Sequence, residues 1–183
     1  MFNILSNIIA IVRGNIKCLV AKLFNKNCKY SCYVRMFGHS RFQVSKGSFK
    51  FGKGAAFGER TSCVVRENAV LEFGDMVYLN SDCKVVCRKS IKIGDNTIFG
   101  PNVYIYDHDH VFDTENGVKR KEYKCSDIVI GKNCWIGAGT IILRGTQIGD
   151  NCVIGAGSVV KGKYCDDSLI IQSRNEKIKR MDD

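Results

Sequence analysis

The stretch IGKNCWIGAGTIILRGTQIGDNCVIGAGSV, residues 130–159, consists of five consecutive six-residue units. An aliphatic residue opens each unit, and a small residue stands four places later. This period matches neither the 3.6 residues of an amphipathic helix nor the two of a sheet strand. It is typical of a coiled parallel β-helix, in which three units form one turn of about 18 residues. The same phase recurs upstream in FGKGAA, FGERTS, FGDMVY and IGDNTI, which begin at Phe51, Phe57, Phe73 and Ile93.

The repeat defines the expected organisation of the 183-residue chain. We expect one all-β domain of roughly six turns, since a solenoid needs at least about three repeats to bury its own core. Its parts are an N-terminal amphipathic helical segment at 1–36, a β-helix at 37–161 with an excursion at 106–129, and a short basic C-terminal tail at 162–183. Because a coil is open at both ends, the flanking segments are candidate caps.

The ten cysteines are scattered without paired spacing. Neither a cleavable signal sequence nor a CxxC zinc pair is visible, so we expect reduced thiols. Cys83, Cys134 and Cys152 occupy the fifth place of their units, where other units carry Thr or Ser. They are therefore predicted to be small buried fillers.

Positive charge is concentrated at the N-terminal end. The net charge is +10, and no acidic residue precedes Glu59. A basic chain invites nucleic acid as a partner, but this one shows neither a recognition helix nor an aromatic stacking platform, so we expect none. The cations before Glu59 are Arg13, Lys17, Lys22, Lys26, Lys29, Arg35, Arg41, Lys46, Lys50 and Lys53.

Apolar residues recur at helical spacing from Leu5 to Leu23, which predicts an amphipathic helix of about 24 residues. The longest wholly apolar run, Ile8–Val12, stops at Arg13, far short of the roughly 20 residues that span a bilayer. Two interpretations stay open: residues 1–30 contact an anionic membrane, or the helix caps the first turn or joins subunits. The expected location is cytoplasmic, either free or peripheral at the inner face of the cell membrane.

The repeat fails between Ile105 and Ile130, and loops that stand off a rigid scaffold often carry function. This excursion contains His108 and His110, flanked by Asp107 and Asp109. The two histidines could ligate a metal, could act as a general base with a supporting partner, or could be exposed loop residues. The metal interpretation is the weakest, because a zinc site needs three protein ligands and only one other histidine, His39, is present.

The repeat units, the segment YDHDH at 106–110 and the resumption IVIGKNCWIGAG at 128–139 resemble the left-handed β-helix acyltransferases. The galactoside and maltose O-acetyltransferases and the polysaccharide O-acetyltransferases are the most similar members, over about residues 70–179. The resemblance implies a left-handed parallel β-helix, acetyl-CoA as co-substrate, no metal, a saccharide acceptor, and a homotrimer with active sites between adjacent subunits.

Gapless alignment with this family assigns roles to individual residues. His110 takes the place of the catalytic histidine and Asn80 that of the substrate-contacting asparagine, with Arg88 and His108 as further acceptor contacts. The structural alternatives are a corner position for Asn80 and simple coil packing for the alanines. The positions implied for CoA are Trp135 and Gly137 beside the pantetheine slot, the Ala138 amide at the thioester oxygen, Ala156, Lys161 and Lys179.

The chemistry supports a histidine base independently of the resemblance. A sugar hydroxyl is far too weakly acidic to ionise at neutral pH, and imidazole is suited to accept its proton during attack on a thioester. The resulting imidazolium can then protonate the CoA thiolate. One amide donor at the developing oxyanion contributes roughly 10²- to 10³-fold.

Two departures from the family pattern bear on the substrate. The tail IIQSRNEKIKR lacks the usual Gly-Asn-Pro segment, and arginine stands at positions 66 and 88 where sugar-specific members have small or acidic residues. We therefore expect an O-acetyltransferase for an anionic glycan of capsule, exopolysaccharide or lipopolysaccharide. The alternatives are an N-acetyltransferase for an amino sugar nucleotide, and a non-catalytic or metal-dependent β-helix protein.

Overall fold

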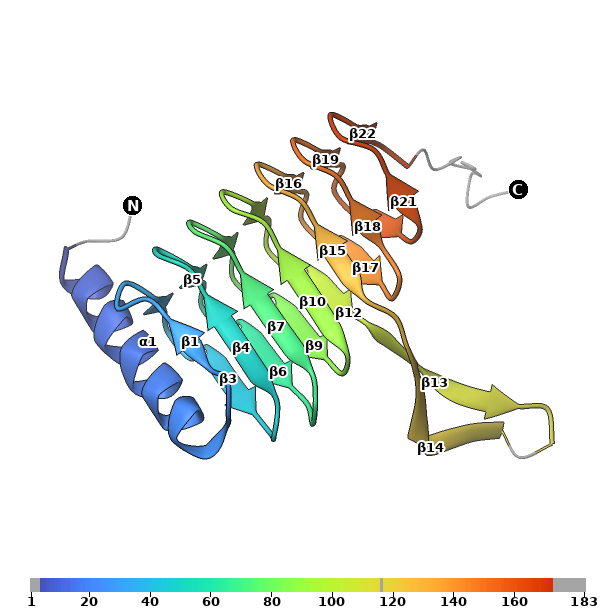
Figure 1. Cartoon of the computed structure of the whole chain (residues 1–183). Coiled ribbons are helices and arrows are strands. Elements are labelled where there is room, and N and C mark those ends of the chain that lie inside the picture. Colours follow the sequence, from blue (N-terminus) through green and yellow to red (C-terminus); the bar gives the residue numbers. More distant parts are fainter. Residues whose placement is uncertain (1–3, 116, 173–183) are drawn as a thin grey trace, which may run out of the picture.

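The computed structural model describes residues 4–115 and 117–172. Its described part is a parallel β-solenoid of about six turns with one N-terminal helix, as the repeat predicts (Figure 1). Each turn contributes one strand to each of three sheets, except that the last described turn has no strand in sheet 3. Sheet 1 contains β1 (Lys29–Tyr30), β4 (Ser48–Phe51), β7 (Val70–Phe73), β10 (Ser90–Ile93), β15 (Ile128–Ile130), β18 (Gln147–Ile148) and β21 (Lys163–Tyr164).

The other two sheets follow the same winding order. Sheet 2 contains β2 (Arg35–Met36), β5 (Ala56–Phe57), β8 (Tyr78–Leu79), β11 (Ile98–Phe99), β16 (Trp135–Ile136), β19 (Val153–Ile154) and β22 (Leu169–Ile170). Sheet 3 contains β3 (Arg41–Val44), β6 (Ser62–Val65), β9 (Lys84–Cys87), β12 (Tyr104–Tyr106), β17 (Ile141–Leu143) and β20 (Val159–Val160).

The corners of the coil explain the residues that follow each unit opener. Gly137 is required by close approach, because a Cβ there would lie 2.5 Å from the backbone nitrogen of Ala156. Asn96, Asn133 and Asn151 adopt positive φ angles of 55–57°, which asparagine tolerates better than most residues. The repeat is thus set by backbone geometry at the corners as much as by its apolar openers.

The core changes character along the coil. Phenylalanines fill the first turns, where the ring centroids of Phe51 and Phe73 lie 5.1 Å apart. The later turns are filled by buried Ile and Val and by the predicted cysteines, all three of which are buried free thiols. Burial raises the pKa of the Cys83 thiol to about 11, so this side chain behaves as a small apolar filler.

The coil extends beyond the predicted boundaries 37–161 at both ends. It begins at Lys29 and its last strand ends at Ile170, so the helical segment predicted at 1–36 is shorter and the tail predicted at 162–183 starts inside the coil. The terminal turns escape the sequence pattern because they lack the aliphatic-Gly openers. They still pair in parallel with the neighbouring turns, as Tyr30 does with Phe51 and Ile170 with Ile154.

The N-terminal helix α1 (Ile4–Phe24) lies across the open end of the coil, against β2 and β3 (Figure 1). It therefore caps the first turn, one of the two predicted roles. Within the described residues, α1 is long and apolar enough to cross a membrane by length and composition. The interruption of the apolar run at Arg13 does not by itself exclude a span, because single polar residues leave a long window apolar.

The excursion is an ordered antiparallel hairpin of β13 (His108–Asp113) and β14 (Gly117–Cys125), which projects away from the coil (Figure 1). Its base is closed by a hydrogen bond from the Ser126 nitrogen to the Asp107 oxygen, at 2.9 Å. The pairing register shifts between His110 and Val111. The excursion is thus an ordered hairpin that leaves the coil at a fixed corner.

Candidate active site

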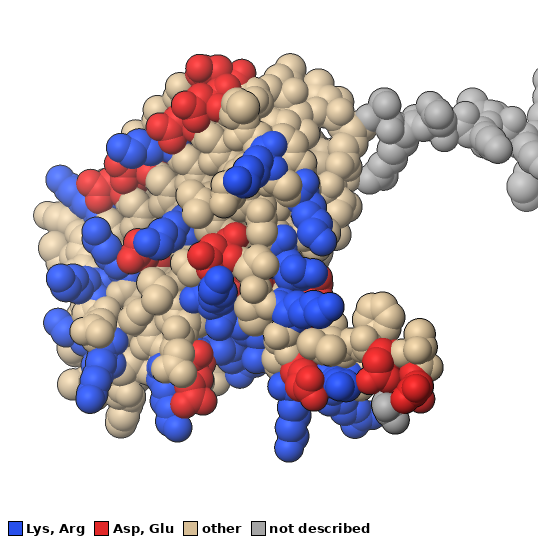
Figure 2. All heavy atoms as spheres, turned by 45° about the vertical axis from the view of Figure 1, so that its right-hand side comes forward, with Lys and Arg blue, Asp and Glu red and all other residues tan. Residues whose placement is uncertain are grey.

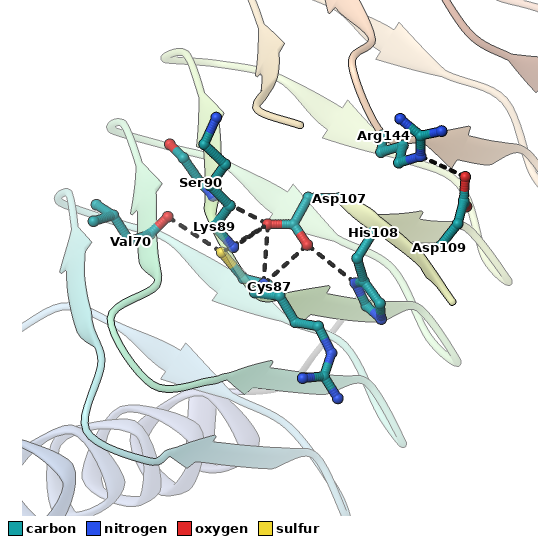
Figure 3. A network of polar contacts seen from close by, with 9 residues as sticks. Val70, Cys87, Lys89, Ser90, Asp107, His108, Asp109 and Arg144 are labelled. Carbon is teal, nitrogen blue, oxygen red and sulfur yellow. Dashed lines mark hydrogen bonds and ion pairs between the residues drawn. The ribbon is translucent and has the colours of Figure 1, made fainter. Parts of the chain in front are cut away.

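Asp107 joins the coil to the hairpin. It directly follows β12 and its side chain is fully buried. Its carboxylate accepts hydrogen bonds from the backbone nitrogens of Arg88, Lys89 and Ser90, at 2.9, 2.7 and 3.0 Å (Figure 3). A single buried anion therefore fixes both the corner of the preceding turn and the start of the hairpin.

His108 is held by this carboxylate. Its Nδ1 lies 3.1 Å from the Asp107 Oδ1, and the side chain is only 13% exposed (Figure 3). An ionised carboxylate can only accept, so Nδ1 carries the proton and donates. The ring also packs edge-on against Tyr123, with 5.5 Å between centroids. His108 is thus fixed in orientation and largely covered.

His110 is exposed and lies two residues further along β13. Its ring centroid is 4.6 Å from that of Tyr123, so both histidines flank the same tyrosine. No hydrogen bond holds its imidazole within the residues the structure describes. This arrangement favours the second of the three interpretations: one histidine open to a reactant and the other fixed beside it.

Arginines line the coil edge where the hairpin leaves. The guanidinium carbon of Arg88 lies 3.4 Å from the Tyr123 ring centroid, and its buried Nε has no hydrogen-bond partner among the described residues. Arg66 occupies the same corner one turn earlier, where its nitrogen bonds the oxygen of Cys87. Arg144, two turns after Arg88 and one turn after Asp107, pairs with Asp109 at 2.5 Å. Figure 2 shows Lys and Arg side chains gathered near the hairpin base.

Asn80 stands at a corner position that is glycine in the neighbouring turns. The residue after the sheet 2 strand is glycine in the turns on either side, Gly58 and Gly100, and asparagine here. Its Oδ1 accepts from the Ser81 nitrogen at 2.8 Å and from the Tyr78 hydroxyl at 3.3 Å. Its side-chain nitrogen makes no hydrogen bond in the described part of the chain and so is available to a ligand.

The residues implied for CoA binding occupy this corner and sheet 2. Trp135 is 54% exposed on the outer face of β16, and Gly137 is buried. Ala138 and Ala156 stack in successive turns, and within the described residues their backbone N–H groups donate no hydrogen bond. Lys161 is exposed just after β20. Lys179 lies outside the described residues.

The predicted site residues form two groups in one protomer. Asn80 and Ala138 lie at the edge between sheets 2 and 3, whereas His110 and Arg88 lie at the edge between sheets 3 and 1. The four-residue strand β9 separates the edges by about 13 Å. The fold of one chain therefore does not bring all the predicted catalytic and cofactor residues together.

Two contributors escaped the sequence reasoning. The sequence pattern indicates Asp107 only as a flank of the histidines, although it continues the register of β12 into a position that is apolar one turn earlier, at Cys87. An acidic residue at an inward position of a coil is the signal that could have found it. Tyr123 is brought to the histidines by hairpin pairing, which no local pattern indicates.

Comparisons with known proteins agree with this fold. The family profile for the bacterial transferase hexapeptide (six repeats) matches residues 127–162. A putative lipopolysaccharide biosynthesis O-acetyl transferase, WbbJ of Escherichia coli K12, is 28% identical over 163 residues, which cover 83% of this chain and 79% of WbbJ. AntD, an N-acyltransferase from Bacillus cereus solved with dTDP and coenzyme A, superposes with a TM-score of 0.64 at 15% identity, covering 90% of this chain and 89% of AntD.

Other relatives match over shorter stretches. Nodulation protein L of Rhizobium leguminosarum bv. viciae is 43% identical over 75 residues, or 41% of this chain. A probable acetyltransferase of Mycobacterium tuberculosis, Rv3034c, is 32% identical over 131 residues, or 71% of this chain. The chain spans only 39% and 43% of the lengths of these two proteins.

The chain folds as a hexapeptide-repeat β-solenoid, and the relatives that it resembles over most of its length are named acetyltransferases. Coenzyme A is present in the solved structure of AntD, which shares this fold.

Proposed function

We propose that this protein transfers the acetyl group of acetyl-CoA to a hydroxyl of an anionic saccharide, with His110 as the general base. The observation that carries the proposal is the exposed His110 imidazole on the projecting hairpin, two residues from His108, which is held by Asp107. The relatives named as O-acetyltransferases, WbbJ among them, support a saccharide acceptor.

The reaction needs one proton acceptor and one oxyanion donor. His110 takes the proton of the attacking hydroxyl while the hydroxyl oxygen bonds to the thioester carbonyl carbon. The negative charge on the carbonyl oxygen is met by the Ala138 N–H, which has no acceptor of its own among the described residues. Collapse breaks the carbon–sulfur bond, and the imidazolium returns its proton to the CoA thiolate. CoA and the acetyl ester leave, and the enzyme is unchanged.

The complete site forms between subunits of a homotrimer. Asn80 and His110 lie at the two edges that border sheet 3. A closed ring that turns sheet 3 toward the threefold axis places the His110 edge of one subunit against the Asn80 edge of the next. The outward positions of sheet 3 are suited to this contact, because four of them are the half-buried apolar or aromatic residues Tyr104, Tyr106, Ile141 and Leu143.

The arginine row supports an anionic acceptor. The buried Nε of Arg88 lacks a partner, and an unpaired buried donor is costly until a ligand satisfies it. Arg66 adds positive charge one turn earlier, whereas Arg144, two turns later, is already paired with Asp109. A carboxylate or phosphate on the acceptor can be bound there with bidentate geometry.

The test is acetyl transfer from acetyl-CoA, measured as free thiol, to matched acceptors. With acidic oligosaccharides as acceptors, CoA thiol is expected to be released about tenfold faster than with neutral oligosaccharides of the same length. One charge-assisted hydrogen bond to the acceptor contributes about 1.5–3 kcal/mol. If an amino sugar nucleotide is the preferred acceptor in this assay, the reaction is N-acetylation and not O-acetylation. Failure of the pure protein to bind acetyl-CoA in calorimetry would overturn the proposal.

A further inference from the structure

Helix α1 is packed on the coil by its polar side chains. Arg13 Nη1 donates to the oxygen of Gly38 at 2.7 Å, and Asn15 Nδ2 donates to the oxygen of Cys32 at 2.8 Å. The Nζ of Lys17 donates to the oxygen of Ser40. Cys32, Gly38 and Ser40 belong to the first turn, which has no preceding turn to cover it. The helix is therefore tied along the coil end by its own polar residues.

Small residues on the inner face of α1 let the helix approach the first turn closely. Ala10, Gly14 and Cys18 are its buried positions. A Cβ on Gly14 would lie 2.3 Å from the oxygen of Val34, so the helix approaches the backbone of the coil directly. With polar and small side chains on the inner side, the large apolar side chains of α1 are left outside.

The outer face of α1 is a continuous apolar surface. Six of its side chains are between 46% and 57% exposed: Ile8, Ile9, Val12, Ile16, Leu19 and Val20. This is the reverse of a surface helix in a water-soluble domain, which places its polar residues outward. A patch of this kind marks a contact with lipid or with another apolar surface.

The charged residues around the outer face of α1 favour one kind of partner for it. Lys22 and Lys26 are exposed at the end of α1 and just after it, and Lys29, Lys50 and Lys53 are exposed on the first two turns; the carboxylate of Glu59 lies beside α1 in a hollow lined by Ile9 and Arg13. Two copies of this face packed together would oppose their cations, whereas an anionic lipid surface neutralises them. Each Lys or Arg near such a surface contributes about 1 kcal/mol to binding.

We propose that α1 lies flat in the interface of an anionic membrane, with its outer apolar face among the acyl chains and the surrounding lysines at the headgroups. Because Arg13, Asn15 and Lys17 remain bonded to the coil, the helix anchors the coil without leaving it. Such an interfacial helix buries its apolar face about 5–10 Å deep.

This orientation sets the height of the active site. In sheet 3, β12 is three strands from β3, so the hairpin base is about 14 Å from the first turn and about 25 Å from the outer face of α1. This consequence rests on the proposed function: the saccharide would be attached to a lipid and reach the site from the membrane surface.

The experiment is co-sedimentation of the full chain with vesicles of phosphatidylcholine alone or with about 30% phosphatidylglycerol, a fraction that gives the surface potential polybasic proteins respond to. The triple variant Ile9→Gln, Val12→Gln, Ile16→Gln is compared with Met76→Gln, which changes an exposed apolar residue of the coil, 53% exposed. Wild type and Met76→Gln are expected to bind the anionic vesicles, and the triple variant at least about tenfold more weakly.

Three outcomes would overturn the proposal: no wild-type binding, equal binding by the triple variant, or a smaller oligomer for the triple variant in solution, which would assign the face to a contact between copies. Acetyl transfer to a soluble acceptor is measured in parallel. It is expected to be unchanged in the triple variant, so a failure of membrane binding is distinguishable from a failure of the proposed activity.

Discussion

Replacing His110 by Ala is expected to lower acetyl transfer by at least about 100-fold, because a positioned general base contributes 10²- to 10⁴-fold. The loss should appear in kcat, while the KM for acetyl-CoA changes little, since the imidazole acts on the acceptor hydroxyl. The side chain is exposed and makes no hydrogen bond in the described residues, so the variant should fold normally. Thiol release under saturating acetyl-CoA measures the effect, and circular dichroism checks the fold.

His108→Ala is the matched control in the same strand. His108 is covered and bonded to Asp107, so its loss should disturb positioning and cost less than about tenfold in turnover. Equal losses at both positions, or a larger loss at His108, would contradict the assignment of His110 as the base.

Replacing Asp107 by Ala is expected to lower the stability of the fold by about 3–5 kcal/mol, because it leaves several backbone donors unsatisfied at about 1–3 kcal/mol each. The change leaves the backbone N–H groups of Arg88, Lys89 and Ser90 without their acceptor. At fixed protein concentration, the thermal midpoint should fall by roughly 10 °C. Asp107→Asn keeps one oxygen acceptor, so its thermal midpoint should lie between those of the wild type and Asp107→Ala.

Asp109→Ala tests whether this effect is specific. Asp109 is two residues away and pairs with Arg144, but its side chain is 47% exposed. An exposed ion pair contributes about 0–1 kcal/mol, so the midpoint should change by about 2 °C or less. If the thermal midpoint of Asp107→Ala also falls by only about 2 °C or less, the buried carboxylate does not hold the corner.

The sequence was sufficient to predict the coil because its period repeats the corner geometry. Gly137 and Asn133 each meet a local backbone requirement, so the motif and the structure carry the same information. The terminal turns lack this signal. Tyr30 and Ile170 are placed by pairing with neighbouring turns, which a six-residue pattern cannot report.

The site was less accessible to sequence reasoning because it depends on contacts between distant segments. The gapless alignment proposed His110 and Asn80, and the structure places them at opposite edges of sheet 3. The pairing that brings Tyr123 to His110 runs across the hairpin, and the bonds of Asp107 run to the preceding turn. Neither partner is near in sequence, so neither could be read from the motif alone.

The proposed sharing of the site between subunits is tested most directly by combining two variants. His110→Ala and Asn80→Ala are co-expressed in equal amounts, and all the trimers that form are purified together. If each site takes His110 from one subunit and Asn80 from the next, about a quarter of the sites regain both residues by random assembly. Activity near a quarter of wild type is predicted. A mixture no more active than the better single variant would contradict the account.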